Sequence, residues 1–302
     1  MISNPADAAL GLLVMYAADM YKGAPAQVAP PVDSRLAANW NVIGYFTGID
    51  AIFRKGLPTM AKGQEVCYGV LVASKANPRQ FAAVVRGTEG IAEWIEDAEF
   101  HPMPYPNGPG TVEAGFWGIY QSMMFKVDAD DPGKKACDGI AAAVPAGAEL
   151  MVVGHSLGSA LATYLTFDLA RVSRAGRWVS ARLFASPHPG DTAFANAFDS
   201  TVGSDRYMLY NYFLDAVPRV PFGPDYDHLP HVTDLRPSEA QARIRFELAC
   251  NHHIVCYCAM LDYQQTNSVP LLGIDQTCSS CIKGPASSTL PTASTASMIP
   301  HP

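Results

Sequence analysis

The sequence has little charge, and what charge it has is weighted towards acid. Its 302 residues include 21 Lys or Arg and 28 Asp or Glu, which gives a formal net charge of −7. A nucleic-acid-binding protein needs a basic face to neutralise phosphates, so this balance argues against a nucleic-acid partner. Charged residues make up only 16% of the chain and apolar residues 49%. This composition excludes a disordered chain and predicts a sizeable core.

Long apolar runs are also missing. No stretch reaches the roughly 18 apolar residues that a membrane-spanning helix needs, so we expect no transmembrane segment. Residues 8–18 are apolar, but Asp7 lies upstream and the first basic residue is Lys22, so the positive region of a signal peptide is absent. The spacing of the apolar side chains instead predicts an amphipathic helix that starts at Asn4-Pro5. We therefore expect a soluble protein, either cytoplasmic or exported without a visible signal peptide.

Cysteine is present in an odd number, which argues against a disulfide scaffold in a chain of this size. The seven positions are Cys67, Cys137, Cys250, Cys256, Cys258, Cys278 and Cys281. The late cysteines flank His252 and His253, but their spacing matches no common zinc-ligand pattern. We expect structural or free thiols, no metal and no cofactor. A zinc-binding regulatory module remains the alternative, which metal analysis would decide.

The order of the expected elements predicts the fold class. Strands that alternate with helices through the middle of a chain are typical of an α/β protein with a mostly parallel sheet and helices on both faces. The expected strands are 41–46, 66–73, 80–85, 150–153, 178–184 and 206–213, with an edge strand at 242–248. The expected helices are 113–125, 134–144, 157–174, 192–199 and 251–261. We expect one domain over residues 1–283 and a flexible tail, rich in Ser, Thr, Ala and Pro, over 284–302.

One short stretch predicts chemistry, namely Gly154-His155-Ser156-Leu157-Gly158, which lies between an apolar strand and a helix. This is the G-x-S-x-G pattern of a nucleophile elbow. A serine at such a tight turn sits on strained backbone, and the residues two positions away must be small because the strand and the helix cross closely. The start of the helix also directs free N–H groups towards developing negative charge.

A serine nucleophile needs a base and an orienting acid, which follow it in the order acid, then histidine, in elbow folds. Asp215 directly follows an apolar strand, and ligand chemistry gathers at the carboxyl ends of such strands. Its alternative role is to cap a turn before a proline-rich loop. His252 and His253 are both candidates for the base. The other histidines considered are His155, which we expect to pack under the turn, and His228 and His231, which lie in an irregular segment.

These residues resemble the class 3 lipases, the fungal-type family of α/β-hydrolases with bacterial and plant members. The resemblance extends over most of residues 10–262 in ordered blocks. The blocks are Val84–Thr88, Trp94–Asp97, Gly115-Phe116, Val152–Gly158, Ala185–Gly190, Asp215–Pro218 and His252–Tyr257. The order and spacing of these blocks are much more specific than the elbow alone.

The resemblance implies a Ser-Asp-His triad made of Ser156, Asp215 and His252. His252 is favoured over His253 because many relatives place the histidine five residues before a tyrosine, here Tyr257. It also implies an oxyanion hole made by Thr88 and the N–H of Leu157. Asp97 matches the acid that steadies the hydroxyl of the oxyanion residue in some relatives. Glu113 departs from the pattern, because family members often have histidine there, and the disulfides of many secreted relatives are not evident.

A short helix with an apolar stripe, near residues 90–99, corresponds to the lid of the family. We expect it to cover the site in water and to contact a lipid surface transiently, or alternatively to stay packed. The expected function is hydrolysis of acylglycerols or other lipid or small esters through an acyl-enzyme. A phospholipase or an aromatic-acid esterase would share the same catalytic residues. A catalytically silent hydrolase-fold binding module is the alternative of a different class.

Overall fold

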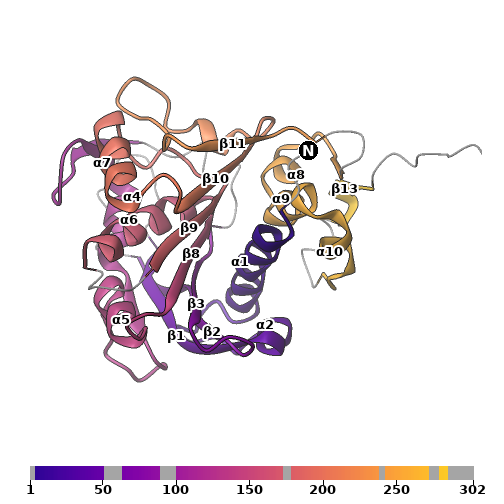
Figure 1. Cartoon of the computed structure of the whole chain (residues 1–302), viewed down its shortest axis with the longest axis horizontal. Coiled ribbons are helices and arrows are strands. Elements are labelled where there is room, and N and C mark those ends of the chain that lie inside the picture. Colours follow the sequence, from indigo (N-terminus) through magenta and orange to yellow (C-terminus); the bar gives the residue numbers. More distant parts are fainter. Residues whose placement is uncertain are drawn as a thin grey trace, which may run out of the picture.

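A computed structural model describes residues 4–50, 63–88, 100–172, 178–237, 242–271 and 279–284 of the chain. Its centre is a nine-stranded sheet with the strand order β11-β10-β9-β8-β3-β2-β1-β6-β7 (Figure 1). The half from β3 to β11 is parallel and the half from β3 to β7 is antiparallel. The strands are β1 (Trp40–Ile49), β2 (Glu65–Ser74), β3 (Gln80–Val85), β6 (Met124–Lys126), β7 (Lys134–Lys135), β8 (Glu149–His155), β9 (Trp178–Phe184), β10 (Tyr207–Tyr212) and β11 (Val232–Leu235).

Helices cover both faces of this sheet (Figure 1). One face carries α4 (Ala114–Ser122), α5 (Ala136–Ala143), α6 (Leu157–Val172) and α7 (Thr192–Val202), whose apolar side chains share one buried cluster with the sheet. The other face carries α1 (Pro5–Gly23) and α9 (Ile254–Leu261), which contribute to a second buried cluster. The remaining helices are α2 (Ser34–Asn39), α8 (Leu248–His252) and α10 (Tyr263–Ser268). The α/β arrangement that the sequence predicts is confirmed.

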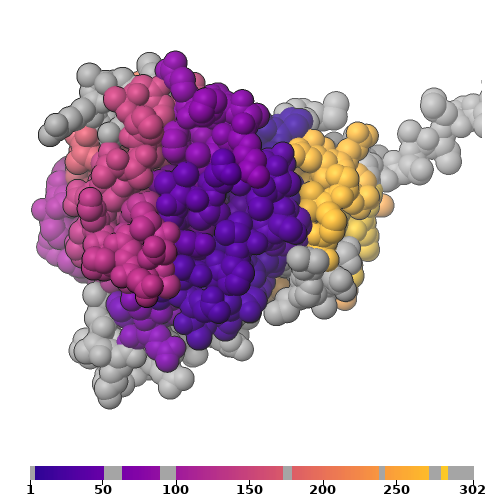
Figure 2. Space-filling view, turned by 90° about the horizontal axis from the view of Figure 1, so that it is seen from below, coloured from indigo at the N-terminus to yellow at the C-terminus, as the bar shows by residue number. Residues whose placement is uncertain are grey.

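The first helix is a packed element of the fold. Its cap is Asn4, whose side chain accepts a hydrogen bond from the Asp7 N–H. The Asp7 carboxylate is buried and pairs with Arg182 of β9 at 2.8 Å, while the Tyr210 hydroxyl of β10 donates to it at 2.6 Å. Helix α1 also packs along α9, so the C-terminal segment, coloured yellow, lies beside the indigo N-terminal part at the surface (Figure 2). The two ends of the described fold therefore stabilise one another. No helix in these ranges is long and apolar enough to cross a membrane.

Several expected elements differ in their bounds. The expected strand at 242–248 is wrong as an edge of the main sheet, because only β12 (Arg243–Ile244) is extended and it pairs with β13 (Ile282–Lys283). The edge strand on the parallel side is β11, which the sequence analysis missed because its Val, Thr, Asp and Leu are mostly half-exposed or exposed. Residues 102–113, where the sequence analysis expected no strand, contain a short antiparallel pair, β4 (Pro102–Pro104) with β5 (Thr111–Glu113).

The expected helix at 251–261 is two helices. Helix α8 ends at His252, His253 is in extended backbone, and α9 starts at Ile254. The expected lid near 90–99 lies outside the described residues, as does the tail beyond residue 284. The expectation of structural or free thiols is wrong for two cysteines, since Cys250 and Cys281 form a disulfide. Cys67, Cys137, Cys256 and Cys258 are not disulfide-bonded in the described structure, and Cys278 lies outside the described residues.

Candidate active site

The turn between β8 and α6 has the backbone strain that the elbow pattern predicts. Ser156 has a φ angle of +59°, in the left-handed region that costs an L-residue about 1–2 kcal/mol. A Cβ atom on Gly154 would lie 2.4 Å from the Gly158 carbonyl oxygen, and one on Gly158 would lie 2.4 Å from the Arg86 carbonyl oxygen. Both glycines are therefore needed for the close crossing of β8, β3 and α6.

Neighbouring hydrogen bonds hold this strained conformation. The Ser156 N–H donates to the Phe184 carbonyl at 3.0 Å, and the Ser159 N–H donates to the Ser156 carbonyl at 2.8 Å. The Ser159 hydroxyl donates to the same Phe184 carbonyl. Leu157 is the first residue of α6, so its N–H has no carbonyl partner within the helix. The turn therefore leaves an N–H group beside the serine, where an oxyanion would form.

At the end of β10, the Asp215 carboxylate is buried and fully engaged. Its Oδ1 accepts the Val217 N–H at 3.0 Å. Its Oδ2 accepts two bonds, one from His252 Nδ1 at 2.8 Å and one from the Tyr257 hydroxyl at 2.7 Å. Asp215 thus orients the His252 ring so that Nδ1 carries the proton and Nε2 is left as the acceptor. The structure thus brings together two of the residues that the sequence predicted. The alternative role of Asp215, capping a turn, accounts only for the hydrogen bond that its Oδ1 accepts from Val217.

The reactive atoms of the candidate base and nucleophile are both buried and unpaired. Ser156 is 1% exposed and His252 is 5% exposed. In the part of the chain that the structure describes, neither Ser156 Oγ nor His252 Nε2 has a hydrogen-bond partner. Catalytic hydrogen bonds are often long in the absence of substrate and tighten when it binds. Buried polar atoms without a partner are uncommon in folded proteins, so both positions are candidates for contact with a ligand.

His155 holds the backbone of His252. Its Nε2 donates to the His252 carbonyl oxygen at 2.7 Å, and the two rings lie 4.6 Å apart between centroids. Burial, and then the neighbouring His252, lower the pKa of His155 well below 6.5. The ring is therefore neutral and donates this hydrogen bond at neutral pH. The sequence analysis expected His155 to pack under the turn, and nothing in the sequence indicated its bond to residue 252.

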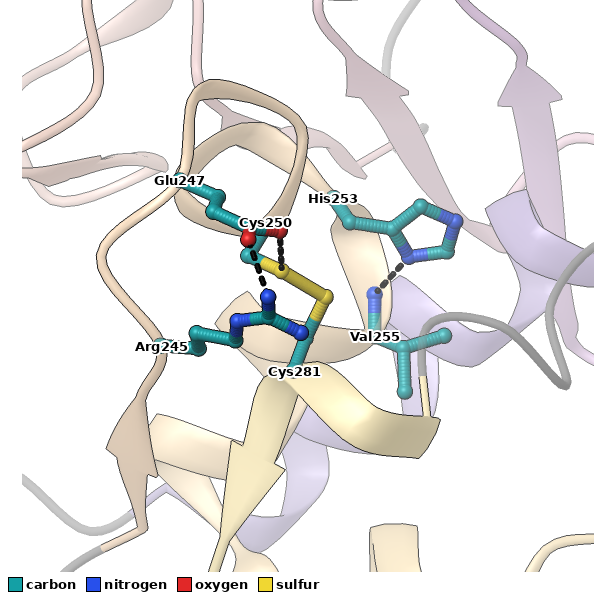
Figure 3. Close-up of a disulfide and its surroundings, with 6 residues drawn as sticks. All are labelled: Arg245, Glu247, Cys250, His253, Val255 and Cys281. Carbon is teal, nitrogen blue, oxygen red and sulfur yellow. Dashed lines mark hydrogen bonds and ion pairs between the residues drawn. A yellow bond between two sulfur atoms is a disulfide. The ribbon is translucent and has the colours of Figure 1, made fainter.

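The other candidate histidines have different surroundings. His253 caps α9, because its Nδ1 accepts the Val255 N–H at 3.2 Å (Figure 3). His231 Nε2 lies 3.2 Å from a carboxylate oxygen of Asp199, in a half-exposed pair. His228 is bonded within its own loop through the Leu229 carbonyl. The histidine whose bond to Asp215 the structure shows is His252.

Tyr257, which sequence reasoning used only as a spacing marker, contacts the Asp215 carboxylate. It is fully buried, and its hydroxyl both donates to Asp215 and accepts the Tyr212 N–H at 2.9 Å. Burial, and then the charge of Asp215, raise the pKa of this phenol well above 10. The hydroxyl therefore keeps its proton throughout the neutral range and remains a donor to Asp215.

The segment after β3 lies directly against the elbow. A Cβ atom on Gly87 would be 2.8 Å from Ser156 Cβ and 3.4 Å from Ser156 Oγ. Thr88, the predicted oxyanion residue, is the next residue and is half-buried. Asp97 lies outside the described residues.

Glu113 stands where histidine is common in the family, and it has a structural role here. It caps α4, because its Oε2 accepts the Phe116 N–H at 2.7 Å. Its Oε1 accepts the His101 N–H at 3.3 Å. Burial raises the pKa of the Glu113 carboxyl.

A disulfide lies next to the base candidate. Cys250, two residues before His252, is bonded to Cys281 beside β13 (Figure 3). Both cysteines are buried, and an ion pair between Arg245 and Glu247 lies beside them. The disulfide thereby fixes helix α8 to the segment that leads into β13. Neither cysteine is available as a thiolate ligand for zinc while the disulfide is intact.

Comparisons with known proteins find related sequences. Residues 82–224 match the family model described as lipase (class 3). The chain is 32% identical to phospholipase A1-II 3 of Oryza sativa subsp. japonica, over 49% of this chain and 40% of that protein. It is 34% identical to secreted mono- and diacylglycerol lipase A of Penicillium cyclopium, over 45% and 41%. It is 28% identical to a lipase of Rhizomucor miehei, over 64% and 53%. The chain thus spans about half or less of these curated relatives.

Solved structures show the same fold. The Rhizomucor miehei lipase propeptide complex aligns with a TM-score of 0.55 and 20% identity, over 74% of this chain and 66% of that one. The structure of M37 lipase aligns with a TM-score of 0.60 and 16% identity, over 89% and 96%. At these identities the likeness shows the fold alone, and it confirms the α/β-hydrolase fold that the sequence predicted.

Proposed function

We propose that the protein, whose residues 82–224 match the class 3 lipase family model, is a serine carboxylic-ester hydrolase acting on lipid esters. The observation that carries the proposal is the bond between His252 Nδ1 and Asp215, which leaves Nε2 unpaired in the same buried region as the Ser156 hydroxyl. The relatives named as lipases and phospholipases support lipid esters as the substrate class.

The proposed reaction is acyl transfer to water. Ser156 Oγ attacks the ester carbonyl carbon as its proton passes to His252 Nε2, and the carbonyl oxygen becomes an oxyanion. His252 then gives the proton to the leaving alcohol, and the acyl group stays on Ser156. Water repeats the sequence: it loses a proton to His252 as it attacks the acyl carbon. The bond between the acyl group and Ser156 Oγ then breaks, His252 returns the proton to Oγ, and the carboxylic acid leaves. Asp215 stabilises the imidazolium in both halves of the cycle.

The proposed oxyanion donors are the N–H of Leu157 and the N–H and hydroxyl of Thr88. Leu157 starts α6, so the helix dipole adds positive potential at the same place. Removing one such donor typically lowers kcat by about 10²–10³. The lid near residues 90–99 and its contact with a lipid surface remain part of this proposal, on the strength of the apolar spacing in the sequence.

The test of the proposal is covalent labelling followed by kinetics. A fluorophosphonate should add to Ser156, and peptide mass spectrometry should locate the adduct. The Ser156→Ala variant should lose both the adduct and p-nitrophenyl ester hydrolysis while keeping its melting temperature. Ser200→Ala, an exposed serine of α7, is the matched control and should behave as the wild type. Unlabelled wild-type protein without esterase activity would favour a catalytically silent binding module.

Phospholipids are a second candidate substrate, favoured by the match to the rice phospholipases A1. A panel of soluble esters, acylglycerol emulsions and phosphatidylcholine vesicles would separate the candidates. Release of fatty acid from the vesicles, at a rate per labelled site equal to or above that for acylglycerols, would assign phospholipase activity. The same panel, extended to esters of aromatic acids, tests the aromatic-acid esterase alternative.

A further inference from the structure

Arg86 is the residue directly after β3, and its side chain is buried rather than solvated. It is only 3% exposed, although arginine is among the residues that are almost never fully buried unless they are paired. Sequence analysis placed it in the Arg-Gly-Thr block without giving it a role. Its position beside Gly87 and Thr88 makes its contacts relevant to the proposed oxyanion hole.

Within the described ranges, the guanidinium bonds main-chain carbonyl groups rather than a carboxylate. Its Nε donates to the Cys67 carbonyl of β2 at 2.7 Å, and its Nη1 donates to the Gly87 carbonyl at 2.7 Å. The group lies over the Tyr21 ring of α1, 3.4 Å from the ring centroid, and near the ring of Tyr68. A guanidinium suits this arrangement because it is planar and carries several N–H donors in fixed directions. The face of an aromatic ring attracts its positive charge. Arg86 thus ties the Gly87 carbonyl to β2 and α1.

Fixing that carbonyl also fixes the next N–H. The Gly87 C=O and the Thr88 N–H belong to one planar trans peptide, so they point in opposite directions. Because the carbonyl points to the guanidinium, the Thr88 N–H points away from it. Glycine at 87 would otherwise leave this peptide free to rotate, since glycine accepts almost every backbone conformation. Arg86 therefore supplies the constraint that the glycine does not.

This peptide lies against the nucleophile. A Cβ atom on Gly87 would contact Ser156 at 2.8 Å, so there is no room for a larger residue that could stiffen the segment itself. The Arg86 carbonyl also lies close to Gly158 in the first turn of α6, because a Cβ atom on Gly158 would be 2.4 Å from the Arg86 oxygen. The main chain of residues 86–87 is thus wedged between β8 and the start of α6.

We propose that Arg86 is a positioning residue that sets the direction of the Thr88 N–H by holding the Gly87 carbonyl, and so completes the oxyanion hole. The inference rests on the proposed function, because it takes Thr88 as an oxyanion donor. It also links α1 to catalysis, since Tyr21 forms the surface on which the guanidinium rests. Arg86 touches no reacting atom and acts through the peptide.

The test compares Arg86→Met and Arg86→Lys with Arg79→Met. Arg79 is the matched control, because its guanidinium also bonds a glycine carbonyl, that of Gly147, but on an exposed turn. Rates are expressed per Ser156 labelled by fluorophosphonate, so that misfolded protein does not count. The second readout is inhibition by an alkyl trifluoromethyl ketone, which Ser156 attacks to form a hemiketal whose oxygen is an oxyanion.

We expect Arg86→Met to lower kcat per labelled site by about 10- to 100-fold with little change in KM, because a misdirected donor loses most of its effect. The inhibition constant of the ketone should rise by a similar factor. Arg86→Lys, with one compact donor group, should show a smaller loss in both readouts. Arg79→Met should leave both unchanged.

Two results would overturn the inference. The first is Arg86→Met protein with wild-type kcat per labelled site and an unchanged inhibition constant. The second applies if the methionine variant does not fold: Arg86→Lys or Tyr21→Leu with lower thermal stability but no change in either readout assigns Arg86 a purely structural role. A wild-type protein that is not labelled at Ser156 and hydrolyses no ester would refute the proposed function itself, and the inference with it.

Discussion

Replacing His155 with glutamine is expected to make the protein less sensitive to acid. The His155 ring is buried and neutral, with a pKa held well below 6.5 by burial and by His252. The unfolded chain binds a proton at this residue near pH 6.5 while the folded chain does not, so stability falls as the pH drops below that value. Each pH unit below about 6.5 should cost about 1.4 kcal/mol until the folded pKa is reached. Above about pH 6.5 the full contribution is present.

Glutamine keeps the structural contact and removes the titration. Its amide N–H reaches as far as an imidazole Nε2 and can still donate to the His252 carbonyl, which His155 holds at 2.7 Å. Unfolding in urea at a series of pH values from about 8 to about 5 gives the free energy for both proteins. The difference between wild type and His155→Gln should move in favour of the variant by about 1.4 kcal/mol per pH unit below about 6.5.

The difference isolates this one residue. His188 also has a lowered pKa, caused mainly by burial, and weakens the fold in acid with the same sign. Because His188 is present in both proteins, its effect cancels. Parallel stability curves for the two proteins at every pH would refute the assignment of His155 as a buried neutral donor. His155→Phe, which lacks the donor, should lower kcat more than His155→Gln does.

Tyr257→Phe removes a fully buried hydroxyl with two hydrogen bonds, so it should lower the free energy of unfolding by about 2–4 kcal/mol and lower kcat more than it raises KM. Wild-type stability in denaturant would show that this hydroxyl is dispensable. The double substitution of Cys250 and Cys281 by serine removes a cross-link with a sequence separation of 31 and should lower the free energy of unfolding by up to about 3.7 kcal/mol. Dithiothreitol should lower the stability of the wild type only. An equal loss of stability in both proteins would contradict this. Gly158→Ala places a Cβ atom 2.4 Å from a backbone carbonyl and should prevent Ser156 labelling, whereas Gly23→Ala, where a Cβ atom meets nothing within 4 Å, should melt and label as the wild type. A Gly158→Ala protein that is labelled normally would show that the crossing of β3, β8 and α6 can accommodate a methyl group.

The elements that the sequence predicted well are those whose type and bounds depend on one local pattern of residues. The apolar run of β3 was predicted with both of its bounds, and β8 was predicted from its apolar residues before the elbow. The break at His253 was missed because no Gly or Pro interrupts residues 251–261. A side chain that caps a new helix over the same stretch shows only in three dimensions.

The candidate site divides in the same way. Ser156 was predicted from the shape of its turn, and Asp215 from its place after a strand, because both signals lie in contiguous sequence. The choice between His252 and His253 rested on resemblance, and the bond between His252 and Asp215 gives it a physical basis. The roles of Arg86 and Tyr257 depend on partners far along the chain, so no local pattern indicates them.

The bond between Cys250 and Cys281 has a practical consequence for anyone who shortens this protein. A truncation that removes the Ser- and Pro-rich end for crystallisation must stop after Lys283, because Cys281 and β13 anchor the segment that bears His252. The choice of host matters for the same reason. Production in an oxidising compartment should yield uniform material, whereas a glutathione-rich cytosol should yield a mixture of bridged and unbridged molecules with different heat tolerance.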